Sequence, residues 1–160
     1  MSVRAWPGHL PLVTLARLYI GGVFVVASWH KIASPHAFAL DVATYDILPL
    51  WLVNLTALVL PWLELLAGAM LVLGLRARAG ALLTSGMMVV FLVALTVALA
   101  RGLDVSCGCF ASQSTGDPIS WRTLGRDAAW LALSLYVLTL DRRSWGIDWL
   151  LDRRSARVAP

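Results

Sequence analysis

The chain has 160 residues, of which 59% are hydrophobic and 14% are charged, with a formal net charge of +4. An average soluble domain is about 45–50% apolar and about 25% charged, so the composition excludes a disordered chain and argues against an ordinary water-soluble domain. What remains is a small integral membrane protein, in which four spans of about 20 residues would occupy half of the chain.

Four apolar stretches predict an all-α fold, an antiparallel four-helix bundle that forms one membrane domain over residues 1–160. The expected helices cover about residues 10–30, 48–74, 79–100 and 120–140. The third stretch contains no charge, whereas the uncharged core of the fourth (128–140) is shorter than the about 18 residues expected of a span. The fourth helix reaches full length if it begins at Ser120, a good N-cap residue after Pro118.

The basic residues predict which side of the membrane each segment faces. Residues 31–47 and 101–119 are expected to be outer loops, and residues 141–160 a cytoplasmic tail. Most Lys and Arg residues lie near the two termini and in the 74–78 connection. Because cytoplasmic segments carry the excess of Lys and Arg, both termini are expected in the cytoplasm. The basic charge therefore indicates topology and contact with membrane lipid, and no soluble basic face suggests nucleic-acid binding.

The cysteines of the chain, Cys107 and Cys109, lie in the second outer loop and are separated by Gly108. Glycine lets the backbone turn tightly enough to bring the sulfurs together, and the strain of so short a bridge makes the disulfide easier to reduce. A ring this small adds little to stability, because long loops gain the most from cross-linking. The spacing favours thiol–disulfide exchange in an oxidising compartment.

Two other interpretations of the cysteine pair stay open. The thiols are inert or form a passive disulfide, since free cysteine also serves as a small hydrophobic residue. Alternatively they bind a metal ion, with His30 and His36 of the first outer loop as further ligands. No CxxC or HxxxH spacing supports zinc, and we predict no metal site.

Arg17 and Glu64 are the ionisable residues farthest from the ends of the predicted spans. Each costs about 2.5–3.5 kcal/mol at the centre of a membrane helix, so each is expected to pair or to face a polar cavity. At about 1.5 Å per residue, Arg17 lies ~10 Å and Glu64 ~14 Å from the inner ends of their spans. These depths predict a structural ion pair between the first two helices. The alternative is a proton or quinone site in the inner half of the bilayer.

Motifs in three of the predicted helices and in the cysteine loop resemble a known family. The first helix reads Leu15-Ala-Arg17-Leu-Tyr-Ile-Gly21-Gly22 and leads to Trp29-His-Lys31, and the second reads Pro61-Trp-Leu-Glu64-Leu-Leu-Ala-Gly68. Both are similar to helices of the DoxX-like membrane proteins. The loop Cys107-Gly-Cys109-Phe110 and the helix start Trp121-Arg-Thr-Leu-Gly-Arg126-Asp127 resemble the MauE branch, the methylamine-utilisation membrane proteins.

The resemblance implies a four-helix, multi-pass protein of the bacterial inner membrane that is associated with thiol–disulfide chemistry. Named MauE proteins are linked to maturation of the disulfide-rich small subunit of methylamine dehydrogenase, and the wider family occurs without that enzyme. The family's cysteines match Cys107 and Cys109. Its polar positions match Arg17, Lys31, Glu64 and Arg126.

The expected function is that of an inner-membrane thiol–disulfide redox protein. Cys107 and Cys109 are its candidate catalytic residues, and its expected partner is an extracytoplasmic thiol or thioredoxin-like protein. Quinone is the candidate cofactor, beside Arg17 and Glu64. The alternatives are a non-catalytic assembly factor or membrane anchor with a passive disulfide and, last, a small-molecule transporter, for which few polar residues would line a path.

Overall fold

The structure is a computed structural model that describes residues 9–103, 119–141, 146 and 147. In chain order, the helices are α1 (His9–Ala33), α2 (Pro35–Thr44), α3 (Leu50–Leu73), α4 (Ala77–Ala100) and α5 (Trp121–Leu140). Within the described ranges no residue belongs to a β-strand. The predicted all-α fold is confirmed.

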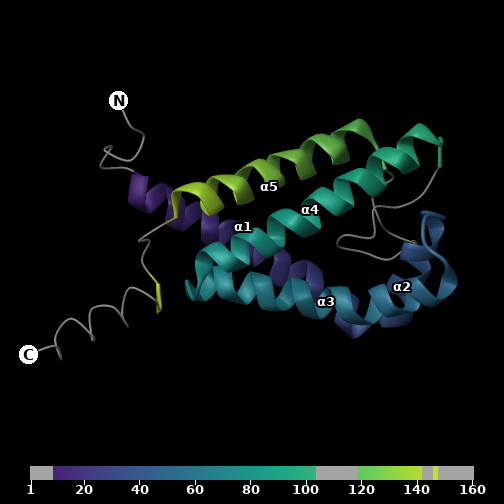
Figure 1. The fold of residues 1–160 in the computed structure, drawn as a ribbon, viewed down its shortest axis with the longest axis horizontal. Coiled ribbons are helices and arrows are strands. Elements are labelled where there is room, and N and C mark those ends of the chain that lie inside the picture. The colour runs from purple at the N-terminus through teal and green to yellow at the C-terminus, as the bar shows by residue number, and fades with distance from the viewer. Residues whose placement is uncertain (1–8, 104–118, 142–145, 148–160) are drawn as a thin grey trace, which may run out of the picture.

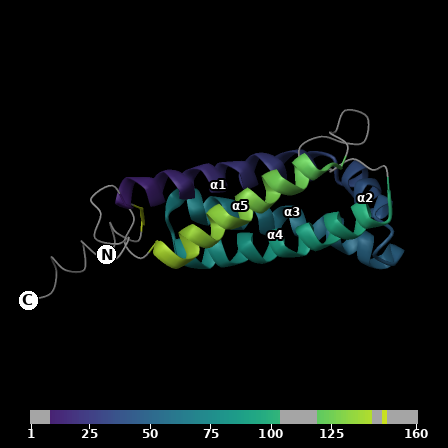
Figure 2. The ribbon, with the colours of Figure 1, turned by 90° about the horizontal axis from the view of Figure 1, so that it is seen from above.

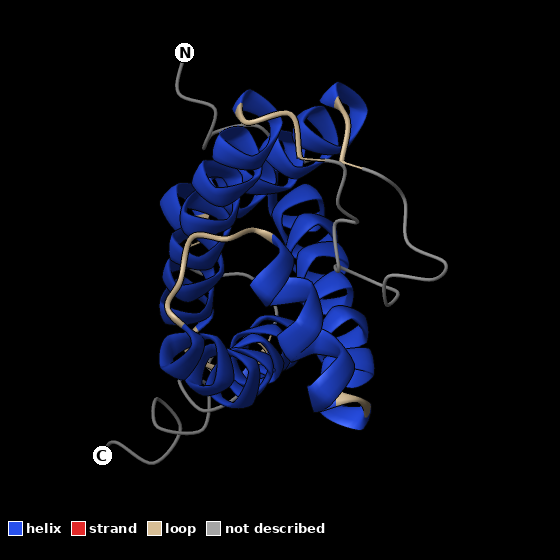
Figure 3. Cartoon of the chain, turned by 90° about the vertical axis from the view of Figure 1, so that its right-hand side faces the viewer, coloured by secondary structure: helices blue, strands red, loops and turns tan. Residues whose placement is uncertain are grey.

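The four long helices form a closed ring in which neighbours run in opposite directions (Figures 1 and 2). α1 packs against α3 and α5, and α4 packs against the same two helices. The short helix α2 lies against α3 at the right-hand end of the bundle in Figure 1, and Figure 3 views the bundle from that side. We call this the α2 end. α1 begins and α5 finishes at the opposite end.

Three helices are long and apolar enough to cross a membrane, namely Leu10–Ala33, Leu50–Leu73 and Ala77–Ala100. This indicates a multi-pass membrane protein by length and composition. α5 has 20 residues but does not meet the same criteria, in keeping with its short uncharged core. The expected N-cap is confirmed, because Ser120 Oγ accepts a hydrogen bond from the backbone N–H of Thr123 at 3.4 Å.

The prediction that residues 31–47 form only a loop is wrong. α1 continues to Ala33, and α2 occupies Pro35–Thr44 with the side chains of Phe38 and Asp41 buried. Pro35 suits the first position of a helix, where its missing N–H has no intrahelical partner and its φ is already helical. A helix of 10 residues is too short to span a membrane, so a search for spans passes over it.

Glycines allow α1 and α3 to approach each other very closely. A Cβ atom built on Gly21 would lie 2.9 Å from the carbonyl oxygen of Gly68, and one built on Gly68 would lie 2.9 Å from the carbonyl oxygen of Gly21. Neither position accepts a larger residue without a shift of the backbone. Small residues at crossings of this kind let the backbones of membrane helices come into contact. The crossing fixes the register of the two antiparallel helices.

Buried hydroxyl groups join α4 to α5. Ser134 Oγ lies 2.6 Å from Thr84 Oγ1 and accepts a hydrogen bond from Ser85 Oγ at 3.0 Å. It also lies 3.3 Å from the carbonyl oxygen of Ala81, to which it donates. Hydroxyl pairs between helices are favourable in a bilayer because the surrounding hydrocarbon offers no other partner.

Candidate functional site

The predicted catalytic residues, Cys107 and Cys109, lie outside the described residues. The segment that carries them follows Leu103 and rejoins the described chain at Ile119. Leu103 and Ile119 both pack against a cluster that contains Tyr45 and the last turns of α4. The segment is therefore attached to the bundle at the α2 end. The four predicted supporting residues are all described.

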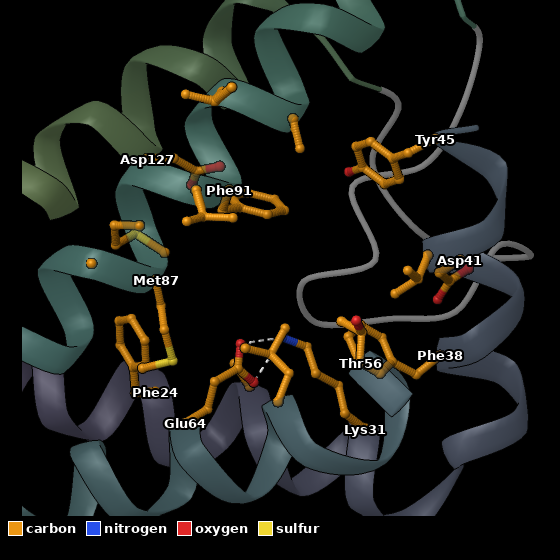
Figure 4. Close-up of a pocket in the computed structure, with 18 of the residues that line it drawn as sticks. Phe24, Lys31, Phe38, Asp41, Tyr45, Thr56, Glu64, Met87, Phe91 and Asp127 are labelled. Atoms are coloured by element: carbon orange, nitrogen blue, oxygen red, sulfur yellow. Dashed lines mark hydrogen bonds and ion pairs between the residues drawn. The ribbon is translucent and has the colours of Figure 1, made fainter. Parts of the chain in front are cut away.

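Lys31 and Glu64 form a partly buried ion pair between α1 and α3 (Figure 4). Lys31 Nζ donates to both carboxylate oxygens of Glu64, at 2.7 and 2.8 Å, and each side chain is only 11% exposed. Lys31 Nζ also lies 5.0 Å from the ring centroid of Phe38 on α2, within range of a cation–π contact. The ammonium group thus joins three helices.

The predicted ion pair between Arg17 and Glu64 is wrong. Arg17 Nη1 lies 3.7 Å from Asp141 Oδ2, immediately after α5, and both side chains are almost fully buried. The structure therefore separates two residues that sequence analysis paired. It places Arg17 at the opposite end of the bundle and Glu64 nearer the α2 end.

The glycine crossing explains why Glu64 forms its ion pair with Lys31 and not with Arg17. A Cβ atom on Gly68 would meet both Gly21 and Val25, so Gly68 is level with the turn of α1 between them. Glu64 lies four residues earlier on the antiparallel α3 and is therefore level with about Ala27. Lys31 lies about 6 Å from that level along α1, and Arg17 about 15 Å from it on the other side. Helical side chains tilt toward the N-terminus of their own helix. In this antiparallel pair, Lys31 and Glu64 lean toward each other, while Arg17 leans away.

Arg126, the fourth predicted supporting residue, pairs with its neighbour on α5. Arg126 Nε donates to Asp127 Oδ1 at 3.0 Å, and the guanidinium lies 4.7 Å from the ring centroid of Trp130. Asp127 is 0% exposed, and its Oδ2 has no hydrogen-bond partner among the described residues. A buried acceptor without a partner costs about 1–3 kcal/mol. Asp127 therefore retains an unused hydrogen-bonding atom inside the protein.

An apolar cavity of about 630 Å³ lies among the five helices toward the α2 end (Figure 4). This volume is within the range of small-molecule sites, which are mostly apolar with a few convergent polar groups. Figure 4 shows the Lys31–Glu64 pair on one side, with Asp127 and Tyr45 across from it. The polar and amphipathic side chains in the lining are Lys31, Asp41, Tyr45, Thr56, Glu64, Asp127 and Trp130.

Tyr45 follows α2 and lies outside the candidate spans. Burial, followed by the charges of Asp127 and Asp41, raises the pKa of Tyr45 to about 12. The phenol group therefore keeps its proton at all physiological pH values. Two carboxylates and a neutral phenol thus lie near one another, Asp41 and Tyr45 at the end of α2 and Asp127 on α5.

The structure brings together only part of the predicted site. Lys31 and Glu64 lie at the cavity, and Arg126 is linked to it through Asp127. Sequence analysis missed Asp41 and Tyr45 entirely. Their signal was the apolar spacing of residues 38–45 around a single acidic residue, which is typical of a short amphipathic helix.

Comparison with known proteins identifies a matching family. The profile of the family described as "Methylamine utilisation protein MauE" matches residues 10–140. The chain is 34% identical over 141 residues to a methylamine utilization protein MauE of Methylorubrum extorquens, covering 88% of this chain and 70% of that protein.

The same protein name is carried by two further relatives. A Methylophilus methylotrophus protein is 34% identical over 135 residues, covering 83% of this chain and 70% of the relative. A Paracoccus denitrificans protein is 30% identical over 131 residues, covering 81% and 70%. No solved structure matches the chain. With the family's sequence profile extending over all four long helices, the chain belongs to the family of the methylamine utilisation protein MauE.

Proposed function

We propose that the chain is a four-span thiol–disulfide oxidoreductase of the bacterial inner membrane, with both termini in the cytoplasm and Cys107 and Cys109 as its redox pair. α5 is the fourth span, which completes the ring with α1 and α4. The cysteine segment is attached at the α2 end, away from the end where α1 begins. With basic termini inside, that attachment lies on the extracytoplasmic side, where disulfides persist.

The Cys-Gly-Cys spacing is the observation that carries this proposal. A strained disulfide between such close residues is a good oxidant. A thiolate of the partner protein attacks one sulfur of the Cys107–Cys109 bond and forms a mixed disulfide. A second partner thiolate then resolves it, so the partner gains a disulfide and the cysteine pair becomes a dithiol. Two electrons and two protons pass to this chain.

The partner in this proposal is an extracytoplasmic protein with a thiol pair, either a thioredoxin-like carrier or the maturing protein itself. The relatives' names connect the family to methylamine utilisation. In a cell that makes methylamine dehydrogenase, the disulfide-rich small subunit of that enzyme is the candidate substrate.

Trapping in cells tests the proposal. In the Cys109→Ser variant, Cys107 can form a mixed disulfide with a partner cysteine but has no neighbouring thiol that could displace the partner, and the reciprocal Cys107→Ser variant isolates Cys109 in the same way. We expect one of the two to accumulate a mixed disulfide with an exported protein, visible as a band that reductant removes. The double variant is the matched control and should give no such band.

Two results would contradict the redox role. The first is a cysteine pair that keeps one redox state under all growth conditions, as shown by alkylation of acid-quenched cells. The second is a double Cys→Ser chain that still supports full maturation of its partner. That second result would identify a non-catalytic assembly factor or anchor instead.

A further inference from the structure

The cavity has no part in thiol exchange as described above, yet it has the form of a binding site. Its walls are almost entirely aliphatic, aromatic and methionine side chains, and its volume of about 630 Å³ accommodates a ring with part of an apolar tail. Such an interior suits a molecule that is itself dissolved in the bilayer.

The rim of the cavity supports entry from the membrane. Leu82, Val90 and Val93 line the cavity from α4 and are 61%, 71% and 60% exposed. They lie on one of the three helices that are apolar enough to span the bilayer. In a membrane, the exposed surface of these residues faces lipid, so an apolar ligand reaches the cavity without crossing water.

Polar atoms in the wall indicate what the ligand's head group offers. Lys31 Nζ has three N–H groups, of which Glu64 receives two, so one remains for an acceptor. Asp127 Oδ2, in the wall on the other side, has no partner among the described residues. The site therefore suits a head group that accepts a hydrogen bond in one state and donates one in another.

We propose that the cavity binds a membrane quinone. A ring carbonyl accepts from Lys31, and after reduction a ring hydroxyl donates to Asp127. This rests on the proposed function, because a cysteine pair that oxidises its partner must pass its electrons on. When the two thiols close into a disulfide they release two electrons and two protons, which convert the two quinone carbonyls into the two hydroxyls of the quinol. The quinone, which accepts the electrons, is therefore bound at the α2 end of the bundle, away from Arg17.

Binding is tested on the purified full-length chain in lipid nanodiscs with decylubiquinone as the probe. Saturable quenching of tryptophan fluorescence is expected, since Trp130 lines the cavity. Decylbenzene, which has a similar apolar body without carbonyls, is the control ligand and should not compete. Equal competition by decylbenzene would overturn the proposal and would indicate that lipid tails fill the cavity.

A matched pair of variants tests the location. Gly86 lines the cavity, and a Cβ atom there meets nothing within 4 Å; the same is true of Gly22, which is outside the lining. Gly86→Phe is expected to fill the cavity and weaken decylubiquinone binding at least tenfold, whereas Gly22→Phe leaves it unchanged. Lys31→Met is expected to weaken binding about tenfold or more, as loss of a charged hydrogen bond does. Unchanged binding in Gly86→Phe would refute the cavity as the site.

The cysteine variants separate this inference from the proposed function. The Cys107→Ser, Cys109→Ser double variant should bind decylubiquinone with unchanged affinity, because binding needs no thiol. Added anaerobically to the reduced wild-type chain, decylubiquinone should be reduced once for every two thiols lost. Thiol exchange without quinone binding refutes only the quinone site, whereas quinone binding without thiol cycling refutes only the redox role.

Discussion

The glycine crossing between α1 and α3 gives the sharpest stability prediction, because the chain supplies its own control. Gly21 and Gly22 are neighbours in the same helix. A Cβ atom on Gly21 would lie 2.8 Å from Val72 Cγ2 and 2.9 Å from the carbonyl oxygen of Gly68, whereas one on Gly22 would meet nothing within 4 Å. The two alanine variants therefore differ only in what the added methyl group contacts.

The magnitude follows from two terms. Replacing glycine by alanine inside a helix gains about 1 kcal/mol of propensity, and this gain is common to both variants. Only Gly21→Ala adds overpacking, which typically costs about 1–3 kcal/mol, and the carbonyl in its path belongs to a helix backbone that cannot rotate away. We expect Gly21→Ala to be less stable than Gly22→Ala by about 1–3 kcal/mol.

The assay is unfolding of the purified chain in mixed micelles by increasing dodecyl sulfate, followed by tryptophan fluorescence. Gly68→Ala should behave like Gly21→Ala, since its Cβ atom would meet Gly21 and Val25 within 3.0 Å. Equal unfolding midpoints for Gly21→Ala and Gly22→Ala would refute the crossing, and with it the register that brings Lys31 to Glu64.

Three further predictions concern the two ends of the bundle. Burial raises the pKa of Tyr45 from 10.0 to about 12, so the stability of the protein should fall as pH rises from 10 toward 12, where the unfolded phenol has lost its proton and the folded one keeps it. The difference in tyrosinate absorbance between wild type and Tyr45→Phe measures the ionisation of Tyr45. Ionisation near pH 10 would contradict the prediction. Arg17→Gln removes the buried ion pair with Asp141 and should lower the unfolding free energy by about 3 kcal/mol, yet leave decylubiquinone affinity unchanged. Adding Asp141→Asn should restore part of the stability, and strictly additive losses would argue against the pair. Gly74→Ala should lower the unfolding free energy by at least about 1–2 kcal/mol, since φ is +65° and a Cβ atom would lie 2.7 Å from Gly146 Cα. An unfolding midpoint equal to that of wild type would refute this contact.

The long helices could be located from sequence because their signal is local. The stretches expected at 48–74 and 79–100 are observed as Leu50–Leu73 and Ala77–Ala100, since a segment surrounded by hydrocarbon must be apolar over its whole length. α2 lacks such a signal. It packs against α3 and α1 and buries only Phe38 and Asp41 among its ten residues, so a search for long apolar stretches passes over it.

The partners in the ion pairs could not be predicted from the sequence, for a geometric reason. Sequence analysis identified Lys31, Glu64 and Arg17 as candidate site residues. Their depths, counted from the ends of the predicted spans, did not determine which of them would form ion pairs. The partners depend on the register of α1 against α3, which the Gly21–Gly68 contact sets, and on the tilt of helical side chains toward their own N-termini.

Composition and apolar patterning alone thus determined the fold class, the membrane setting and the position of the cysteine pair between the third and fourth long helices. Only the tertiary structure revealed the cavity, because its polar groups come from four separate segments and include Lys31, Glu64, Tyr45 and Asp127. Whether such residues share one space depends on the rotation of each helix about its axis, and each residue along a helix turns its side chain by about 100°. That rotation is fixed by packing between helices, which sequence patterns within one helix do not record.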